Sequence, residues 1–221
     1  MDTTQNDNTE SLEPLRRETG LVRRSGLLAR RVRELAQQVR ELDLGDDVEV
    51  VFPDKDLEAA VRETLERPKG PLTRGHLKRM KDLRVADKEI EDLTGLEHAV
   101  NLTRLDLGEK RISGISPLAS LTNLEWLNLE HNQISDITPL ASLTNLTEIG
   151  LLNNQISDIS PLASLTNLER LDLSRNQVRD VGPLAALTNL ERLDLRHNPL
   201  SQESVVVHVP ALRSKGVYVD L

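Results

Sequence analysis

The sequence predicts an α/β solenoid, and two observations support this fold class. Four stretches of the 221-residue chain begin with Leu-Thr-Asn-Leu and follow one another every 22 residues, from Leu121, Leu143, Leu165 and Leu187. Apolar residues recur in columns at the same interval. A unit of this length cannot bury its own apolar face, so the units must stack on one another in a one-dimensional array.

Two of these columns predict parallel strands. The first column holds Leu83, Leu105, Leu127, Ile149, Leu171 and Leu193, and the second holds Val85, Leu107, Leu129, Leu151, Leu173 and Leu195. Residues two apart in a strand point to the same face, so both columns face the core and the residues between them face outward. Six such strands, about 4.8 Å apart, form a sheet roughly 25 Å long.

The opposite side of each unit predicts a short helical turn. One column of inward-facing residues comprises Ile115, Ile137, Ile159 and Val181, and prolines follow two residues later at Pro117, Pro139, Pro161 and Pro183. Proline begins a tight turn and keeps the segment short. Short segments opposite strands impose curvature, so we expect a leucine-rich-repeat horseshoe with a parallel concave sheet and short helical turns on the convex side.

Polar residues also recur with the repeat. The column Asn132, Asn154, Asn176 and Asn198 falls in a turn, where a side-chain amide can satisfy buried backbone groups between units. A second column, Asp136, Asp158 and Asp180, is interpreted as structural for the same reason.

Five segments are expected along the chain. Residues 1–20 are polar and form a disordered tail, and residues 21–45 form a heptad-patterned helix. Residues 48–82 form a helical N-terminal cap, 83–200 the leucine-rich repeats, and 201–221 a C-terminal cap made of a helix and a strand. The two caps shield the apolar ends of the array.

The N-terminal cap is predicted to contain two helices. Asp54 or Asp56 can cap the first helix, and Thr73 can cap a second helix that runs through Met80. The C-terminal cap is predicted to contain a helix through Arg213.

The last predicted strand spans residues 217–219. It is placed in step with the repeat because Val217 lies 22 residues after Leu195. A strand there protects the final edge of the sheet.

The heptad-patterned helix has two open interpretations. Its apolar seam consists of Leu21, Leu28, Val32, Leu35, Val39 and Leu42. Such a seam favours a two-stranded coiled coil, which would make the protein a homodimer through residues 21–44. Three heptads are marginal for a coiled coil, so docking of the helix on the cap of its own solenoid is weighted equally.

Charge is unevenly distributed. The total formal charge is −8. Residues 1–10 carry a net charge of −3 and residues 11–42 a net charge of +4, so residues 43–221 carry −9. An acidic body argues against nucleic-acid or membrane binding by the repeats. The basic helix from Arg16 to Arg40 keeps both partners open as an alternative function, with the repeats as support.

Several classes of function are not expected. The chain has no cysteine, and no motif places a nucleophile, a phosphate loop or a metal-ligand set. We therefore expect no cofactor, no metal and no enzymatic activity. The first 20 residues lack the apolar run of a signal peptide, and no stretch of about 18 apolar residues occurs, so we expect a cytoplasmic protein.

The candidate binding site lies on the concave face. Trp126 is the only tryptophan, and Leu152 follows the adjacent strand across Gly150. We expect Trp126 and Leu152 to form an apolar spot with a shallow pocket at Gly150, because tryptophan is the commonest residue at interface centres. The other partner-binding residues expected around this spot are Asn128, Glu130, His131, Glu148, Arg170 and Arg192.

The arginines of the later repeats alternate with acids. Arg170, Arg175, Arg192 and Arg196 stand among Asp172 and Asp194. Cross-strand and diagonal ion pairing is the favoured interpretation, and capture of an acidic partner segment is the alternative.

The chain resembles the bacterial internalin-like leucine-rich-repeat proteins. The resemblance rests on Phe52-Pro53-Asp54 and Leu57-Glu58-Ala59-Ala60-Val61, which look like that family's N-terminal cap, and on Leu-Thr-Asn-Leu with Asn-Gln-Ile-Ser-Asp-Ile, which look like its repeat. It covers residues from about 52 to the C-terminus. It implies a binding function, because similar arrays bind receptors or regulate a phosphatase. We therefore expect a scaffold or regulatory subunit that holds a protein partner of unknown identity on its concave face.

Overall fold

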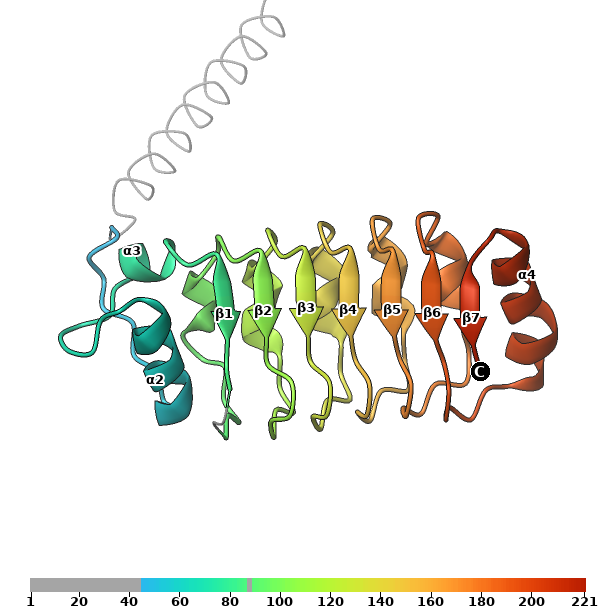
Figure 1. Cartoon of the computed structure of the whole chain (residues 1–221), viewed down its shortest axis with the longest axis horizontal. Helices are drawn as coiled ribbons and strands as arrows, with labels where there is room; N and C mark the ends of the chain where they lie inside the picture. Colours follow the sequence, from blue (N-terminus) through green and yellow to red (C-terminus); the bar gives the residue numbers. More distant parts are fainter. Residues whose placement is uncertain (1–44, 87–88) are drawn as a thin grey trace, which may run out of the picture. The chain divides into compact units, whose positions relative to one another are not determined.

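The computed structural model describes residues 45–86 and 89–221, and residues 46–221 form one compact unit (Figure 1). The expected tail at 1–20 and the expected heptad helix with its self-association seam lie outside the described residues. No helix within the described ranges is long and apolar enough to cross a bilayer.

A seven-stranded parallel sheet runs the length of this unit, with the strands in chain order (Figure 1). The strands are β1 (Asp82–Arg84), β2 (Arg104–Asp106), β3 (Trp126–Asn128), β4 (Glu148–Gly150), β5 (Arg170–Asp172), β6 (Arg192–Asp194) and β7 (Tyr218–Asp220). The first six pair in the register of the 22-residue repeat, with Leu105 beside Leu127 and Leu127 beside Ile149. The predicted leucine-rich-repeat solenoid is confirmed.

Short 3-10 helices cover the inner face of the sheet (Figure 1). They are η1 (Leu96–His98), η2 (Ser116–Ser120), η3 (Thr138–Ser142), η4 (Ser160–Ser164) and η5 (Gly182–Ala186). From η2 onward each has proline in its first turn, as predicted. Asp136 and Asp158 each accept a backbone N–H two residues later, at 2.8 Å, which confirms that this column is structural.

Buried asparagine side chains join successive repeats. Asn154 Nδ2 donates to the carbonyl oxygens of Leu129 at 2.9 Å and Leu151 at 3.1 Å, and its Oδ1 accepts the Ile134 N–H at 3.0 Å. Asn132 and Asn176 repeat the same pattern. Each amide satisfies backbone groups that no strand or helix reaches, which confirms the role predicted for this column.

The N-terminal cap begins with α2 (Lys55–Thr64). Asp54, rather than Asp56, caps this helix: Asp54 Oδ1 accepts the Asp56 and Leu57 N–H groups at 3.0 Å. Its other oxygen accepts the Glu91 N–H at 2.9 Å, which ties the cap to the first repeat. Burial acts to raise the pKa of Asp54, but the backbone hydrogen bonds outweigh burial and lower it.

The second cap helix, α3 (Arg74–Leu77), is shorter than predicted. Thr73 begins it as expected, and its N–H donates to His76 Nδ1 at 3.1 Å, but the helix ends before the buried Met80. Gly75 lets the chain at Asp46 pack closely, since an added Cβ would lie 2.5 Å from Asp46 Cβ.

The C-terminal cap consists of η6 (Ser204–His208), which is a π-helix, α4 (Val209–Ser214) and β7. The helix through Arg213 is confirmed. The register predicted for the last strand is wrong, because Val219 pairs with Leu193, 26 positions earlier, and Val217 lies before the strand. This last unit is four residues longer than the 22-residue period, because η6 and α4 replace the 3-10 turn at the end of the core.

The last strand is protected from further pairing. Arg213 Nη2 donates to the Val219 carbonyl oxygen at 2.8 Å, on a strand that has no further partner in the described sheet. A guanidinium on an edge carbonyl occupies the acceptor that an added strand needs.

We expect Asn154→Ala to lower the free energy of unfolding by about 2–4 kcal/mol, because it leaves buried backbone donors and acceptors unpaired. Urea denaturation followed by circular dichroism measures the change. Asn145→Ala is the matched control: Asn145 Nδ2 donates one bond to the Thr122 carbonyl in an exposed turn, so the expected loss is below about 1 kcal/mol. Equal losses in the two variants would contradict this account.

Candidate functional site: the outward face of the sheet

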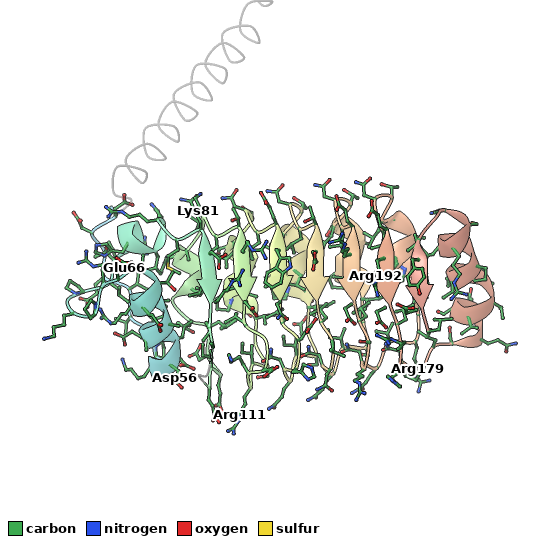
Figure 2. All side chains as sticks on the ribbon, viewed as in Figure 1. Asp56, Glu66, Lys81, Arg111, Arg179 and Arg192 are labelled. Atoms are coloured by element: carbon green, nitrogen blue, oxygen red, sulfur yellow. The ribbon has the colours of Figure 1, made fainter. Side chains whose placement is uncertain are left out.

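The outward face of the sheet presents the residues that flank each buried middle residue. Strands β1 to β5 alternate between exposed or half-buried ends and a buried centre, so the sequence can vary on this face without touching the core. Polar and charged side chains cover it, Arg192 among them (Figure 2). We call this surface the sheet face. Its first column comprises Asp82, Arg104, Trp126, Glu148, Arg170, Arg192 and Tyr218, as the pairing register shows.

Trp126 is half-buried and held by its neighbours on β1 and β2. The Arg104 guanidinium lies 4.7 Å from the centre of the Trp126 ring, in cation–π contact. Arg104 Nε lies 3.7 Å from an Asp82 carboxylate oxygen. Asp82 therefore holds Arg104 in place, and Arg104 covers one face of the Trp126 ring. The sequence does not reveal this contact.

The structure does not bring Trp126 and Leu152 into one apolar spot. Trp126 pairs with Glu148, whereas Leu152 accepts the His131 N–H at 2.8 Å and lies beyond the end of β4. Four residues along a strand correspond to roughly 13 Å. The expected apolar spot is thus replaced by an aromatic residue and a leucine that are separated by polar groups.

Glu130 occupies the place where a shallow pocket was expected. A Cβ added to Gly150 would lie 2.7 Å from Glu130 Oε1, so the Glu130 side chain lies over the glycine. Gly108 is covered in the same way by Asn128 Nδ2, at 2.9 Å from an added Cβ. The two glycines provide room for side chains of the neighbouring strand rather than for a ligand.

Glu130 also separates two hollows of the sheet face. One hollow, of about 310 Å³, is lined by Asp106, Asn128, Glu130 and His131, among others. The other, of about 320 Å³, is lined by Glu130, Glu148, Asp172, Arg170 and Arg192, among others. All but two of the expected partner-binding residues line these hollows; the exceptions are Trp126 and Leu152, and Gly150 lies beneath Glu130.

Burial raises the pKa of Glu130, and the nearby carboxylate of Asp172 raises it further. His131 opposes this effect in part. His131 itself has a left-handed backbone, with φ of 55°, and its Nδ1 lies 3.0 Å from Asn153 Nδ2. The turns after β3 and β4 thus bring side chains of adjacent repeats together.

The arginines of the later repeats are paired within the protein. Arg170 Nη1 lies 3.4 Å from Glu148 Oε2 on the neighbouring strand, and Arg192 Nη2 lies 3.6 Å from Asp220 Oδ2. Arg196 forms a two-pronged contact with Asp194. The favoured interpretation, ion pairing between strands, is confirmed for Arg170 and Arg192. It is wrong for Arg196, whose partner Asp194 lies two residues away in the same repeat.

Asp194 is the most buried carboxylate of this group. Burial acts to raise its pKa, but hydrogen bonds from the Arg196 side chain and backbone outweigh burial and lower it. Asp172 and Asp194 also accept the backbone N–H two residues later, at 2.8 and 3.0 Å. These carboxylates therefore close the turn after each strand.

The chemistry of the sheet face is that of polar recognition. Within the described ranges, no three His, Asp or Glu side chains gather in a way that could hold a metal ion. The side chains present are two aromatic residues, Trp126 and Tyr218, paired arginines and carboxylates, and amides. Such a surface suits hydrogen bonds, charge pairing and stacking with another macromolecule.

Comparison with known proteins places this architecture among leucine-rich-repeat proteins. A family model described as "Leucine Rich repeats (2 copies)" matches residues 122–164 and 166–205. A search of curated proteins finds no match.

Solved structures of Listeria monocytogenes internalins are similar to the chain. InlF shares 29% identity over 78% of this chain and 58% of its own, with a TM-score of 0.61, so the present chain spans less than two thirds of the InlF chain. InlC2 shares 31% identity over 76% of this chain and 83% of its own, with a TM-score of 0.56. The functional domain of InlJ, at 23% identity over 68% of this chain and 38% of its own, shows the same fold with a TM-score of 0.58.

We expect Arg104→Ala to expose Trp126 and shift its fluorescence emission to longer wavelength, because the guanidinium no longer covers one ring face. Trp126 is the only tryptophan of the chain, so its emission reports this site directly. Arg175→Ala, on an exposed residue two repeats away, should leave the emission unchanged. An Arg104→Ala spectrum identical to that of the wild type would mean that the stacking does not persist in solution.

We expect Glu130→Gln to stabilise the protein at pH 7 by up to about 1 kcal/mol, with partial exposure limiting the gain. The folded-state pKa of Glu130 is raised, so ionisation costs more in the folded than in the unfolded protein. Stability lost above the unfolded pKa, about 4.3, returns as pH falls through the folded pKa. Urea unfolding of both proteins between pH 7 and pH 4 should therefore show a difference that shrinks with acidity. A difference that grows instead would reverse the assigned sign.

Proposed function

The chain belongs to the internalin-like leucine-rich-repeat family, and from this premise we propose that it is a protein-binding scaffold or regulatory subunit whose partner docks on the sheet face around Trp126. The observation that carries the proposal is the contrast between the two sides of the sheet. The inner side is closed by Leu, Ile and Val side chains, whereas the outer side presents Trp126 among charged groups that the fold does not need.

Trp126 has the properties of an interface anchor. It is half-buried, its ring is oriented by Arg104, and polar residues surround it. An oriented aromatic side chain loses little conformational entropy on binding, and tryptophan is enriched among the residues that dominate interface energies.

The charged residues around Trp126 supply specificity. Arg170 and Arg192 already have carboxylate partners, so a docking surface must match this pattern of both signs rather than a single charge. The two hollows that Glu130 lines can accept side chains that protrude from the partner. We propose that Glu130, Glu148, Asn128 and His131 contact the partner together with Trp126.

We expect the partner, captured from lysate of the source organism with the full chain as bait, to be lost with Trp126→Glu. Loss of a central tryptophan costs at least about 2 kcal/mol, which corresponds to roughly 30-fold weaker binding. Mass spectrometry identifies the protein, and calorimetry with the purified partner measures the affinity. Gln133→Glu is the matched control, because it adds the same charge in the same repeat on an exposed residue off the sheet face.

Two outcomes would contradict the proposal. Equal losses in Trp126→Glu and Gln133→Glu would assign the effect to net charge rather than to the site. A partner kept by Trp126→Glu but lost when residues 1–44 are removed would move the function to the basic N-terminal segment.

A further inference from the structure

The N-terminal cap contains a strongly basic segment within an acidic protein. Residues 67–81, which we call the basic cap segment, contain no aspartate or glutamate. Their cationic residues are Arg67, Lys69, Arg74, Lys78, Arg79 and Lys81, with His76 among them. The segment comprises the loop after α2, helix α3 and the approach to β1.

Most of these cations lack a carboxylate partner among the described residues. Lys78 Nζ lies 2.9 Å from Asp46 Oδ1, and Arg74 also has a partner. The ion pairs formed between described residues include none with the side chains of Lys69, Arg79 or Lys81, all of which are exposed. Their charges therefore remain available to an anion.

The cations also crowd one another. Burial lowers the pKa of His76, and the positive charges of Arg67 and Arg79 lower it further, with Asp47 in partial opposition. Arg67 Nε is buried without a hydrogen-bond partner. Like charges held together in this way are relieved by an anionic ligand.

Acidic residues also flank the basic cap segment in the chain, with Glu63 and Glu66 just before it and Asp82 just after it. Lys81 lies on the edge of the cap where α3 lies, and Asp56 lies on the opposite edge, at the start of α2 (Figure 2). Asp46, Asp47 and Glu49 are the acids on the neighbouring strand segment, and Asp46 is paired with Lys78. The acidic carboxylates of the later repeats lie more than a Debye length of about 8–10 Å away along the array.

An exposed apolar residue lies beside the basic cap segment. The Val50 N–H donates to the Leu72 carbonyl at 2.8 Å and the Arg74 N–H to the Val48 carbonyl at 2.9 Å, so the strand segment around Val50 runs along residues 72–74. Val51, on that segment, is 71% exposed. An exposed apolar residue on a segment that pairs with a basic one is a composition that suits contact with the lipid interface.

We propose that the N-terminal cap binds the surface of an anionic lipid bilayer through Lys69, Arg79 and Lys81, with Val51 as an apolar contact. Clusters of four to eight basic residues bind anionic headgroups in this way. Single-stranded nucleic acid is disfavoured, because it requires aromatic stacking platforms. The chain's three aromatic residues are Phe52, which is buried, and Trp126 and Tyr218, which lie on the sheet face.

This inference does not depend on the proposed partner site. The basic cap segment lies before the first strand and shares no residue with the region around Trp126. Bilayer binding through the cap leaves the sheet face available, so each site can fail without the other.

The test is co-sedimentation of the full chain with vesicles of phosphatidylcholine, with and without phosphatidylglycerol. We expect binding only to the anionic vesicles, weakened by raising the salt concentration. The triple variant Lys69→Glu, Arg79→Glu, Lys81→Glu should bind at least tenfold more weakly. Its matched control, Arg175→Glu, Arg179→Glu, Lys215→Glu, makes the same charge change at exposed residues of the later repeats and the C-terminal cap, and should keep most of the binding.

Additional variants test the apolar contact and distinguish the cap from other binding sites. Val51→Gln should reduce binding severalfold, and unchanged Trp126 emission and circular dichroism show that each variant is folded. Three results would overturn the proposal: equal binding to neutral vesicles, equal losses in the two triple variants, or loss only when Arg24, Arg31 and Arg33 of the N-terminal segment are changed to Glu. Binding to oligonucleotides without binding to vesicles would also overturn it.

Discussion

The buried asparagine amide is the interaction on which the rest of the array depends. Each repeat is made of strands of three residues and 3-10 turns of similar length, and such short elements leave many backbone groups unpaired. Asn132, Asn154 and Asn176 each reach the carbonyl of the preceding repeat and a carbonyl of their own repeat, while their oxygen accepts an N–H. Stacking therefore satisfies polar groups as well as burying leucine, and the two requirements together impose one register.

That constraint explains why the sheet face is free to carry function. The asparagine hydrogen bonds and the apolar contacts that join successive repeats lie behind the strands, so most flanking residues of the strands are not needed for stacking. Side chains of the sheet face also contact one another in a fixed arrangement. Arg104 orients Trp126, Glu130 lies over Gly150, and Arg196 holds Asp194, in each case between neighbouring positions of the register. A rigid scaffold with independently variable side chains is what a recognition surface requires.

Periodicity predicted the fold well because each column has one physical role. The strand columns, the proline turns and the asparagine ladder all follow from spacing alone. Side-chain direction does not: Glu130 bends over Gly150 and fills the expected pocket, and Trp126 turns toward Arg104 instead of Leu152. The last strand departed from the 22-residue period because a helix, not a turn, crosses the end of the core. The net charge of a long stretch does not reveal the basic cap segment, because acids before and after it in the chain, among them Asp46, Glu49 and Glu66, offset its cations.

The two caps that close the ends of the array use their cations differently, and this difference bears on function. At the C-terminal end, Arg213 occupies the Val219 carbonyl, so the cation serves to block further pairing. At the N-terminal end, α2 is the element that closes the core, with Leu57 and Val61 buried, and Asp54 ties it to the first repeat. Closure there needs none of the exposed cations of residues 67–81. Charges that neither close the core nor pair within the fold are costly to gather, which is the physical reason to assign them to an anionic surface outside the protein.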